Sequence, residues 1–195
     1  TPSTSDSAAA AVAWKSAIYG AVEDGIETYD QTGARVSKIE GGEVEALAVV
    51  PSFGASGTPV LLSLDTSNSS LVPYTIEADT SLTPIKGAAI QSSMLLEGMC
   101  SLTSKLDGQH YAILLGSSGQ IEQWHIYENK AGAFSGTLTR TLQVGSEPKF
   151  CVGDSVTNSI YVTEEAVGVW QFNGDVEAET VPELVDVKKF GNFTG

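Results

Sequence analysis

Positive charge is the scarcest property of this 195-residue chain. The chain has 10 Lys and Arg against 24 Asp and Glu, so its net charge is −14 and its pI is near 4.3. Binding to a nucleic acid depends on clustered cations that neutralise phosphates, and binding to an anionic membrane surface makes the same demand. The composition therefore argues against both a nucleic acid and a membrane as partners.

Long apolar runs, cysteines and histidines are also few. No stretch of 18 apolar residues predicts a membrane-spanning helix, and the apolar segment Ala8–Ala13 lacks the basic residues that would precede it in a signal peptide. Two cysteines cannot make a disulfide-rich scaffold, and no Cys/His spacing resembles a zinc site. His110 and His125 have no Gly-x-Ser-x-Gly motif beside them, so no acyl-transfer triad is indicated.

What the chain does have is a series of short runs rich in β-branched and aromatic residues, cut by Gly, Asn, Asp and Ser. These runs predict strands at Ala17–Tyr19, Ile26–Tyr29, Val60–Leu64, Tyr111–Leu115, Ile121–Tyr127, Ile160–Thr163 and Val167–Phe172. No segment shows a long 3.6-residue period, so we expect an all-β fold. We expect one domain over residues 14–190, with flexible tails at residues 1–13 and 191–195.

Four of these segments repeat one pattern of strand, turn, strand ending in an aromatic residue, and longer turn. The marker residues Tyr29, Tyr74, Trp124 and Trp170 are spaced by 45, 50 and 46 residues. A near-constant period of this size is typical of the four-stranded antiparallel blades of a β-propeller. The sequence therefore predicts about four blades, either closed into a ring or forming part of a larger one.

A second repeat precedes the later blades at an interval of 52 residues. It begins at Glu45, Glu97 and Lys149, and it predicts the innermost strand of each of those blades. The three charged residues would then be neighbours at one mouth of a central channel, where a solvated charge cluster is the simplest interpretation. Cys100 and Cys151 fall on adjacent innermost strands in slightly different register, so a disulfide is compatible with the pattern but not required by it.

Three motifs stand out in the C-terminal half: the Gly-x-Ile-Glu-Gln-aromatic strand at Gly119–Trp124, the Leu-Thr-Arg strand at Leu138–Arg140 and the segment IYVTEEAVGVW at Ile160–Trp170. In these motifs the chain resembles the β-propeller phytases. In the N-terminal half, DGIETYDQTGARV at Asp24–Val36 is similar to a Gly-Leu-x-Val-Tyr-Asp blade of the same family. The resemblance implies a secreted or periplasmic, calcium-dependent hydrolase of inositol hexakisphosphate (phytate) with six blades. Four blades would then be an incomplete arc, like the extra N-terminal domain that some members carry ahead of a complete catalytic domain.

Carried over position by position, the resemblance leaves few of the family's site residues in place. Lysines, an arginine, a tyrosine and acidic calcium ligands of the family are replaced at Val22, Glu23, Ala48, Asp65–Ser67, Glu97, Ser117, Lys149–Phe150 and Ser155. The matching residues are Arg140, Asp154, Glu164 and Glu165. The resemblance implies Arg140 as a substrate-binding residue, Glu165 and Asp154 as metal ligands, and Arg140 and Glu165 as residual catalytic candidates.

These losses lead us to expect a chain that is not a competent phytase alone and binds calcium weakly or not at all. We expect it to be auxiliary to a catalytic phytase domain in the same polypeptide, or to self-associate through open propeller edges, with inositol phosphates as possible ligands. Two alternatives stay open. One is an active calcium-dependent phytase that uses Arg140, Asp154 and Glu165, and the other is a scaffold propeller that binds protein or glycan.

Overall fold

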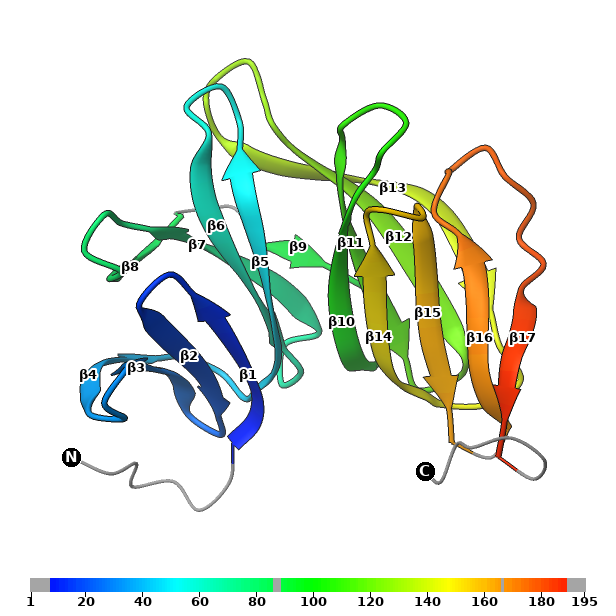
Figure 1. The fold of residues 1–195 in the computed structure, drawn as a ribbon, viewed down its shortest axis with the longest axis horizontal. Coiled ribbons are helices and arrows are strands. Elements are labelled where there is room, and N and C mark those ends of the chain that lie inside the picture. Colours follow the sequence, from blue (N-terminus) through cyan, green and yellow to red (C-terminus); the bar gives the residue numbers. More distant parts are fainter. Residues whose placement is uncertain (1–7, 86–88, 166, 189–195) are drawn as a thin grey trace. The chain divides into compact units, whose positions relative to one another are not determined.

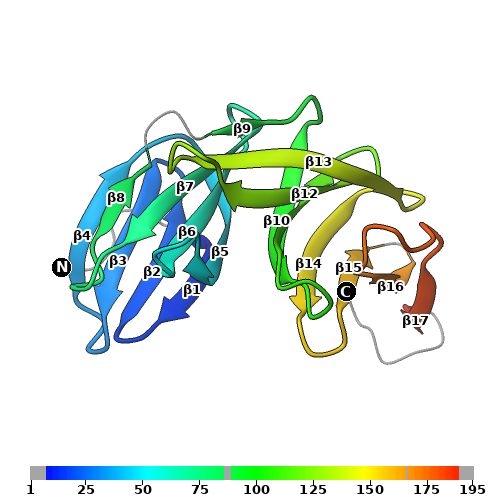
Figure 2. The same ribbon diagram turned by 90° about the horizontal axis from the view of Figure 1, so that it is seen from above.

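The computed structural model describes residues 8–85, 89–165 and 167–188, and the described residues form β-strands and turns (Figures 1 and 2). The strands lie in four antiparallel sheets, in each of which the four main strands pair in sequence order. This up-and-down meander is that of a propeller blade. The chain divides into two compact units, unit 1 (Thr1–Ser93 and Glu128–Ser135) and unit 2 (Met94–Tyr127 and Gly136–Gly195).

Unit 1 contains two sheets. Sheet A comprises β1 (Ala8–Trp14), β2 (Ala17–Val22), β3 (Gly25–Asp30) and β4 (Arg35–Glu40). Sheet B comprises β5 (Val44–Phe53), β6 (Thr58–Asp65), β7 (Ser70–Ile76) and β8 (Leu82–Pro84), with a short fifth strand, β9 (Ile90–Gln91), paired to β7. The two sheets pack around the buried residues Ala17, Tyr19, Ala21, Ile26, Val44, Leu61, Tyr74 and Ile76.

Unit 2 also contains two sheets. Sheet C comprises β10 (Leu96–Thr103), β11 (His110–Gly116), β12 (Gln120–Glu128) and β13 (Phe134–Gln143), and the tip of its β12–β13 hairpin belongs to unit 1. Sheet D comprises β14 (Pro148–Asp154), β15 (Ser159–Glu164), β16 (Gly168–Asn173) and β17 (Glu183–Val187). Their shared core includes Leu102, Tyr111, Ile113, Leu115, Ile121, Leu142, Ile160, Val162 and Phe172.

The hairpin tip is fixed to sheet B by an aromatic stack and one hydrogen bond. The rings of Phe134 and Phe53 lie 5.1 Å apart and nearly parallel. The Ala55 amide donates to a carboxylate oxygen of Glu128 at 2.7 Å. A chain segment far away in sequence thereby completes unit 1.

The burial of the second strand shows whether one or both faces of sheets B, C and D are covered. In β6 and β11 nearly every residue is buried, which requires packing on both faces. In β15 the buried residues Ile160 and Val162 alternate with the half-buried Tyr161 and Thr163. Sheet D therefore buries one face against sheet C and leaves the opposite face accessible.

The predicted all-β propeller fold is confirmed, and the segments of the second repeat form the first strands of sheets B, C and D, which are β5, β10 and β14. The predicted tail at residues 1–13 is wrong for its second part, because residues 8–14 form β1 by pairing with β2. Residues 1–7 and the predicted tail at 191–195 lie outside the described residues. The disulfide that the sequence left open is formed, and it joins Cys100 of β10 to Cys151 of β14.

Candidate functional site

Lys149 lies at the start of β14 between two carboxylates. Its ammonium nitrogen is 3.3 Å from Glu97 Oε2 and 3.2 Å from Glu147 Oε1. Hydrogen bonding to Glu147 raises the pKa of Lys149, burial acts against this, and Glu97 adds to the rise. The expected proximity of Glu97 and Lys149 is thus observed. The ammonium group of Lys149 is already paired with the carboxylates of Glu97 and Glu147.

Glu45, the third charged residue of the same repeat, lies in unit 1 beside further acids. A hollow of about 320 Å³ is lined by Ala9, Glu23, Glu43, Val44 and Glu45. Its three glutamates give it a strongly negative field, which repels a polyphosphate. Glu23 stands where the resemblance would place a phosphate-binding lysine, so the substitution reverses the charge of this position.

The adjacent Glu164 and Glu165 have different environments. Glu164 is 1% exposed at the end of β15 and accepts hydrogen bonds of 2.6 Å from Ser146 Oγ and from Trp170 Nε1. Burial alone would raise the pKa of Glu164, but the hydrogen bonds from Ser146 and Trp170 outweigh it and hold this pKa below its usual value. Glu165 is exposed in the turn that follows.

The environment of Glu164 predicts an acid-sensitive contribution to the stability of unit 2. Because its folded pKa is lowered, the ionised carboxylate stabilises the fold above the ordinary value of 4.5, and this stabilisation is lost as the pH falls through the folded pKa. We expect Glu164→Gln to lower the free energy of unfolding at about pH 7, and the difference from wild type to shrink between about pH 5 and pH 3. Urea unfolding across this range measures it.

Glu165→Gln is the matched control, since it makes the same chemical change one residue away in an exposed turn. It should leave the unfolding curves unchanged. A Glu164→Gln difference that stays constant from about pH 7 to pH 3 would contradict the assignment.

Arg140, the candidate for substrate binding, lies on β13 with its guanidinium turned into the protein. Its Nε donates to Gln123 Oε1 at 2.7 Å, and its terminal nitrogens donate to the carbonyls of Asn173, the last residue of β16, and of Ala178 in the loop that follows. Gln123 in turn donates to the carbonyl of Gly174 at 2.9 Å. Burial lowers the pKa of Arg140, with Asp175 opposing the change. The side chain therefore ties sheet C to the β16–β17 loop.

Asp154 uses its carboxylate within the β14–β15 turn. One oxygen accepts from the amides of Val156 and Thr157, and the other accepts from the Thr157 hydroxyl at 2.7 Å. The Thr157 hydroxyl and the Val156 amide hold the pKa of Asp154 below its usual value. This arrangement is a turn cap, in which a short acidic side chain satisfies the backbone that follows it.

The calcium ligands implied by the resemblance do not come together. Asp154 pairs with Ser159 at one end of β15, whereas Glu165 follows its other end. At about 3.3 Å per residue, these positions are about 20 Å apart along the strand. Calcium needs about six to eight oxygen ligands around one point. Asp154 and Glu165 therefore do not share one metal site, and over the described ranges no group of three or more His, Cys, Asp or Glu residues is placed to hold a metal ion.

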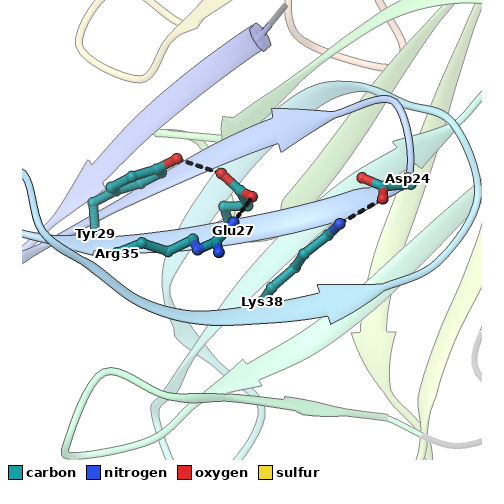
Figure 3. A network of polar contacts seen from close by, with 5 residues as sticks. All are labelled: Asp24, Glu27, Tyr29, Arg35 and Lys38. Atoms are coloured by element: carbon teal, nitrogen blue, oxygen red, sulfur yellow. Dashed lines mark hydrogen bonds and ion pairs between the residues drawn. The ribbon is translucent and has the colours of Figure 1, made fainter. Parts of the chain in front are cut away.

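The buried carboxylate of Glu27 in sheet A was not predicted from the sequence. Glu27 is fully buried on β3, where it accepts from the Tyr29 hydroxyl and pairs with Arg35 at 2.6 Å, while Lys38 pairs with Asp24 nearby (Figure 3). Sheet C repeats the contact between carboxylate and ring, because Trp124 Nε1 donates to Glu122 at 2.8 Å. The shared pattern Ile-Glu-x-aromatic was the signal that could have revealed it.

A second hollow, of about 340 Å³, opens beside β15, β16 and β17. Its polar lining consists of Thr157, Asn158, Ser159, Gln171, Asn173 and Glu183, together with Val181. The carboxylate of Glu183 is the one formal charge in this lining. The hollow therefore also lacks the cations that a phosphate ligand requires.

The fold defines the class of protein. Solved structures similar to this chain include the Pan2 WD40 domain of Neurospora crassa, with a TM-score of 0.60 and 10% identity over 90% of this chain and 51% of that one. A protein from Lactobacillus plantarum has a TM-score of 0.62 and 13% identity over 94% of this chain and 56% of that one. These likenesses concern the fold alone, and with the four blades they identify a β-propeller.

The sequence defines the family more narrowly. Residues 10–194 match the phytase family model, so the chain belongs to the phytase family. A curated relative is the 3-phytase of Bacillus subtilis (strain 168), which is 22% identical over 172 residues. That alignment covers 84% of this chain and 45% of the relative, so the chain spans less than half the length of that enzyme. Within the described part of the chain, no helix is long and apolar enough to cross a membrane.

Proposed function

We propose that this chain is a phytase-family propeller domain that is catalytically impaired alone and assists a catalytic phytase domain. The observation that carries the proposal is that the guanidinium of Arg140 is already hydrogen-bonded within the protein. Arg140 matches a cation of the family's site, yet Gln123 and two backbone carbonyls occupy its guanidinium. A group held in this way cannot turn to a phosphate without breaking the contacts that anchor the β16–β17 loop.

The surrounding charges support the same proposal. Phytate is a polyanion, and a body of net charge −14 repels it unless cations are concentrated at the site. Glu23, Glu43 and Glu45 line one hollow, and Lys149 is paired with Glu97 and Glu147. An incomplete arc of a six-bladed propeller is the architecture that we propose for a chain whose match spans 45% of its relative.

A phosphate-release assay tests the impaired activity. The chain, incubated with phytate and calcium, is expected to release no phosphate above the level of a heat-denatured sample, while the Bacillus subtilis 3-phytase releases it under the same conditions. Turnover comparable to that enzyme would overturn the proposal. Calorimetric titration with calcium separates the active alternative, which requires tight binding at several sites, from the impaired domain, which is expected to give no such signal.

The auxiliary role needs its own measurement. The chain is joined ahead of a catalytic phytase domain, and kcat/KM for phytate and the melting temperature are compared with those of the catalytic domain alone. We expect at least one of them to increase. An unchanged kcat/KM together with an unchanged melting temperature would contradict the auxiliary role. It would not affect the conclusion from phosphate release by the isolated chain.

We also propose a secreted or periplasmic location. The disulfide between Cys100 and Cys151 supports it, because such bonds persist in oxidising compartments and are rare in the cytosol. Its two cysteines join the innermost strands of sheets C and D, so oxidation fastens two blades together. Trapping of free thiols in protein isolated directly from its source organism tests this, and two free thiols would argue for a reducing compartment.

A further inference from the structure

A small hollow lies in unit 1 where the tip of the β12–β13 hairpin meets sheet B. Its volume is about 170 Å³, and the described residues that line it stand between positions 53 and 134 of the chain. Pockets that enclose a drug-sized ligand have volumes of about 300 to 1,000 Å³. This one, which we call the hairpin hollow, therefore suits a group about as large as one side chain.

The floor of the hairpin hollow is apolar. The rings of Phe53 and Phe134 stack with their centroids 5.1 Å apart, and both residues are less than a tenth exposed. Val60 of β6 also lines the hollow and is 2% exposed. These side chains offer apolar contact to a ligand, and aromatic rings also attract a positive charge.

The edge of the hairpin hollow carries a carboxylate in a fixed position. Of the described residues that line the hollow, Glu128 alone has a formal charge, and it is exposed. Its Oε2 accepts from the Ala55 amide at 2.7 Å, and a Cβ added to Gly54 would lie 2.5 Å from the same oxygen. A Cβ added to Gly132 would lie 3.7 Å from Oε1. The carboxylate is thus held between two turns, and its Oε1 is left for a ligand.

Hydroxyl groups add neutral acceptors to the lining. Thr75 of β7 lines the hollow, and so do Ser56 and Thr58, whose hydroxyl oxygens lie 2.8 Å apart. A hydroxyl oxygen accepts hydrogen bonds from an ammonium group, which has three donors and no acceptor. Carboxylate and hydroxyl oxygens beside an apolar floor therefore match a ligand with a cationic head and an apolar stem.

We infer that the hairpin hollow binds a lysine side chain presented by a partner protein. The four-carbon stem of the lysine lies along the apolar floor, and its ammonium group reaches the exposed carboxylate of Glu128. Long basic side chains bury their stems and keep their charged heads at the surface in this way. The ammonium group donates to Glu128 Oε1, the oxygen that the Ala55 amide does not use.

Charge and geometry select lysine among the side chains. The net charge of −14 attracts basic segments of a partner and repels acidic ones. An arginine guanidinium binds a carboxylate best through both oxygens at once, but the Ala55 amide already occupies Oε2 of Glu128. A lysine ammonium is a compact point charge, so one oxygen is enough for it. The partner is therefore a protein that exposes a lysine on a basic segment.

An NMR titration of the isotope-labelled full chain with the acetylated and amidated tripeptide Gly-Lys-Gly tests the inference. We expect the amide signals of Ala55 and Gly132 to shift, because both residues lie against the Glu128 carboxylate. For a single side chain, a dissociation constant of about 1 mM is expected. The same peptide with norleucine keeps the apolar stem without the charge, and it should bind at least about tenfold more weakly.

Glu128→Gln removes the charge but keeps an oxygen for the Ala55 amide, and it should weaken binding of the lysine peptide by about tenfold or more. Glu179→Gln is the matched control, because it changes the net charge equally at an exposed residue of unit 2, and it should bind as wild type does. The spectra also show whether each variant is folded.

Three results would each overturn the inference. They are equal binding of the lysine and norleucine peptides, unaltered binding by Glu128→Gln, and lysine-induced shifts that spare both Ala55 and Gly132. Pentylammonium has the same stem and head without a peptide backbone, so it tests for a free amine as the ligand. Binding of pentylammonium without binding of the lysine peptide would likewise contradict a lysine side chain as the occupant.

Discussion

Replacing Arg140 with methionine is expected to lower the free energy of unfolding by about 3 kcal/mol, because three acceptors lose their donors at about 1 kcal/mol each. The acceptors are Gln123 Oε1 and the carbonyls of Asn173 and Ala178. Methionine keeps much of the apolar stem, so the loss reports mainly the hydrogen bonds. Denaturant unfolding followed by tryptophan fluorescence measures it, since Trp124 and Trp170 both lie in unit 2.

Lys149→Met is the control for removing a positive charge. Its side chain is 50% exposed and its two ion pairs are accessible to solvent, so the expected loss is below about 1 kcal/mol. If Arg140 were instead a substrate-binding residue, Arg140→Met would leave stability nearly unchanged and abolish a phosphate-release activity of the wild type. That pair of results would contradict the anchoring role.

The central strands of sheets B and C could largely be predicted from sequence because their apolar runs are buried on both faces. β11 is an example, since its predicted core Tyr111–Leu115 is buried throughout. β1 could not be predicted in this way. Its alanines have low β-propensity, and the strand forms because it pairs with β2 and supplies small side chains opposite Gly20. β9 has only two residues, and its pairing with β7 is likewise set by tertiary structure.

The aromatic residues that marked the repeat occupy nearly equivalent positions in their blades, and Trp170 is the exception. Gly25 and Gly168 each begin the third strand of a blade, opposite Val22 and Glu164. Trp170 therefore occupies the position of Glu27, and the residue equivalent to Tyr29 is Phe172. Both arrangements bring a carboxylate to a ring donor, Glu27 with Tyr29 and Glu164 with Trp170. A one-dimensional pattern of aromatic residues cannot distinguish these two geometries.

The candidate site was harder to predict because its residues acquire their roles from contacts far away in sequence. Matching motifs selected Arg140, but its partners Asn173 and Ala178 lie 33 and 38 residues further along. Asp154 also matched the motif, yet the local turn uses both of its oxygens. Side chains retained from a family pattern can therefore serve the fold, and only the geometry reveals which partners they have.

Gly168→Ala is expected to destabilise unit 2 by about 4 kcal/mol. Gly168 has φ of +153°, a backbone conformation that L side chains rarely adopt, and a Cβ added there would lie 2.0 Å from the Asp186 carbonyl oxygen of β17. Relief requires β17 to separate from β16, which also displaces the β16–β17 loop that Arg140 anchors. Denaturant unfolding monitored by fluorescence gives the loss, and hydrogen exchange should locate it in sheet D.

Gly108→Ala separates backbone strain from this steric contact. Gly108 also has a positive φ, +71°, but an added Cβ would meet no atom within 4 Å, so the expected loss is only about 1 kcal/mol. Gly25 occupies the equivalent place in sheet A, where an added Cβ would lie 2.0 Å from the Ile39 carbonyl oxygen. Gly25→Ala should therefore reproduce the large loss in unit 1. Equal, small losses for all three variants would mean that the third and fourth strands of these blades do not approach as closely as this packing requires.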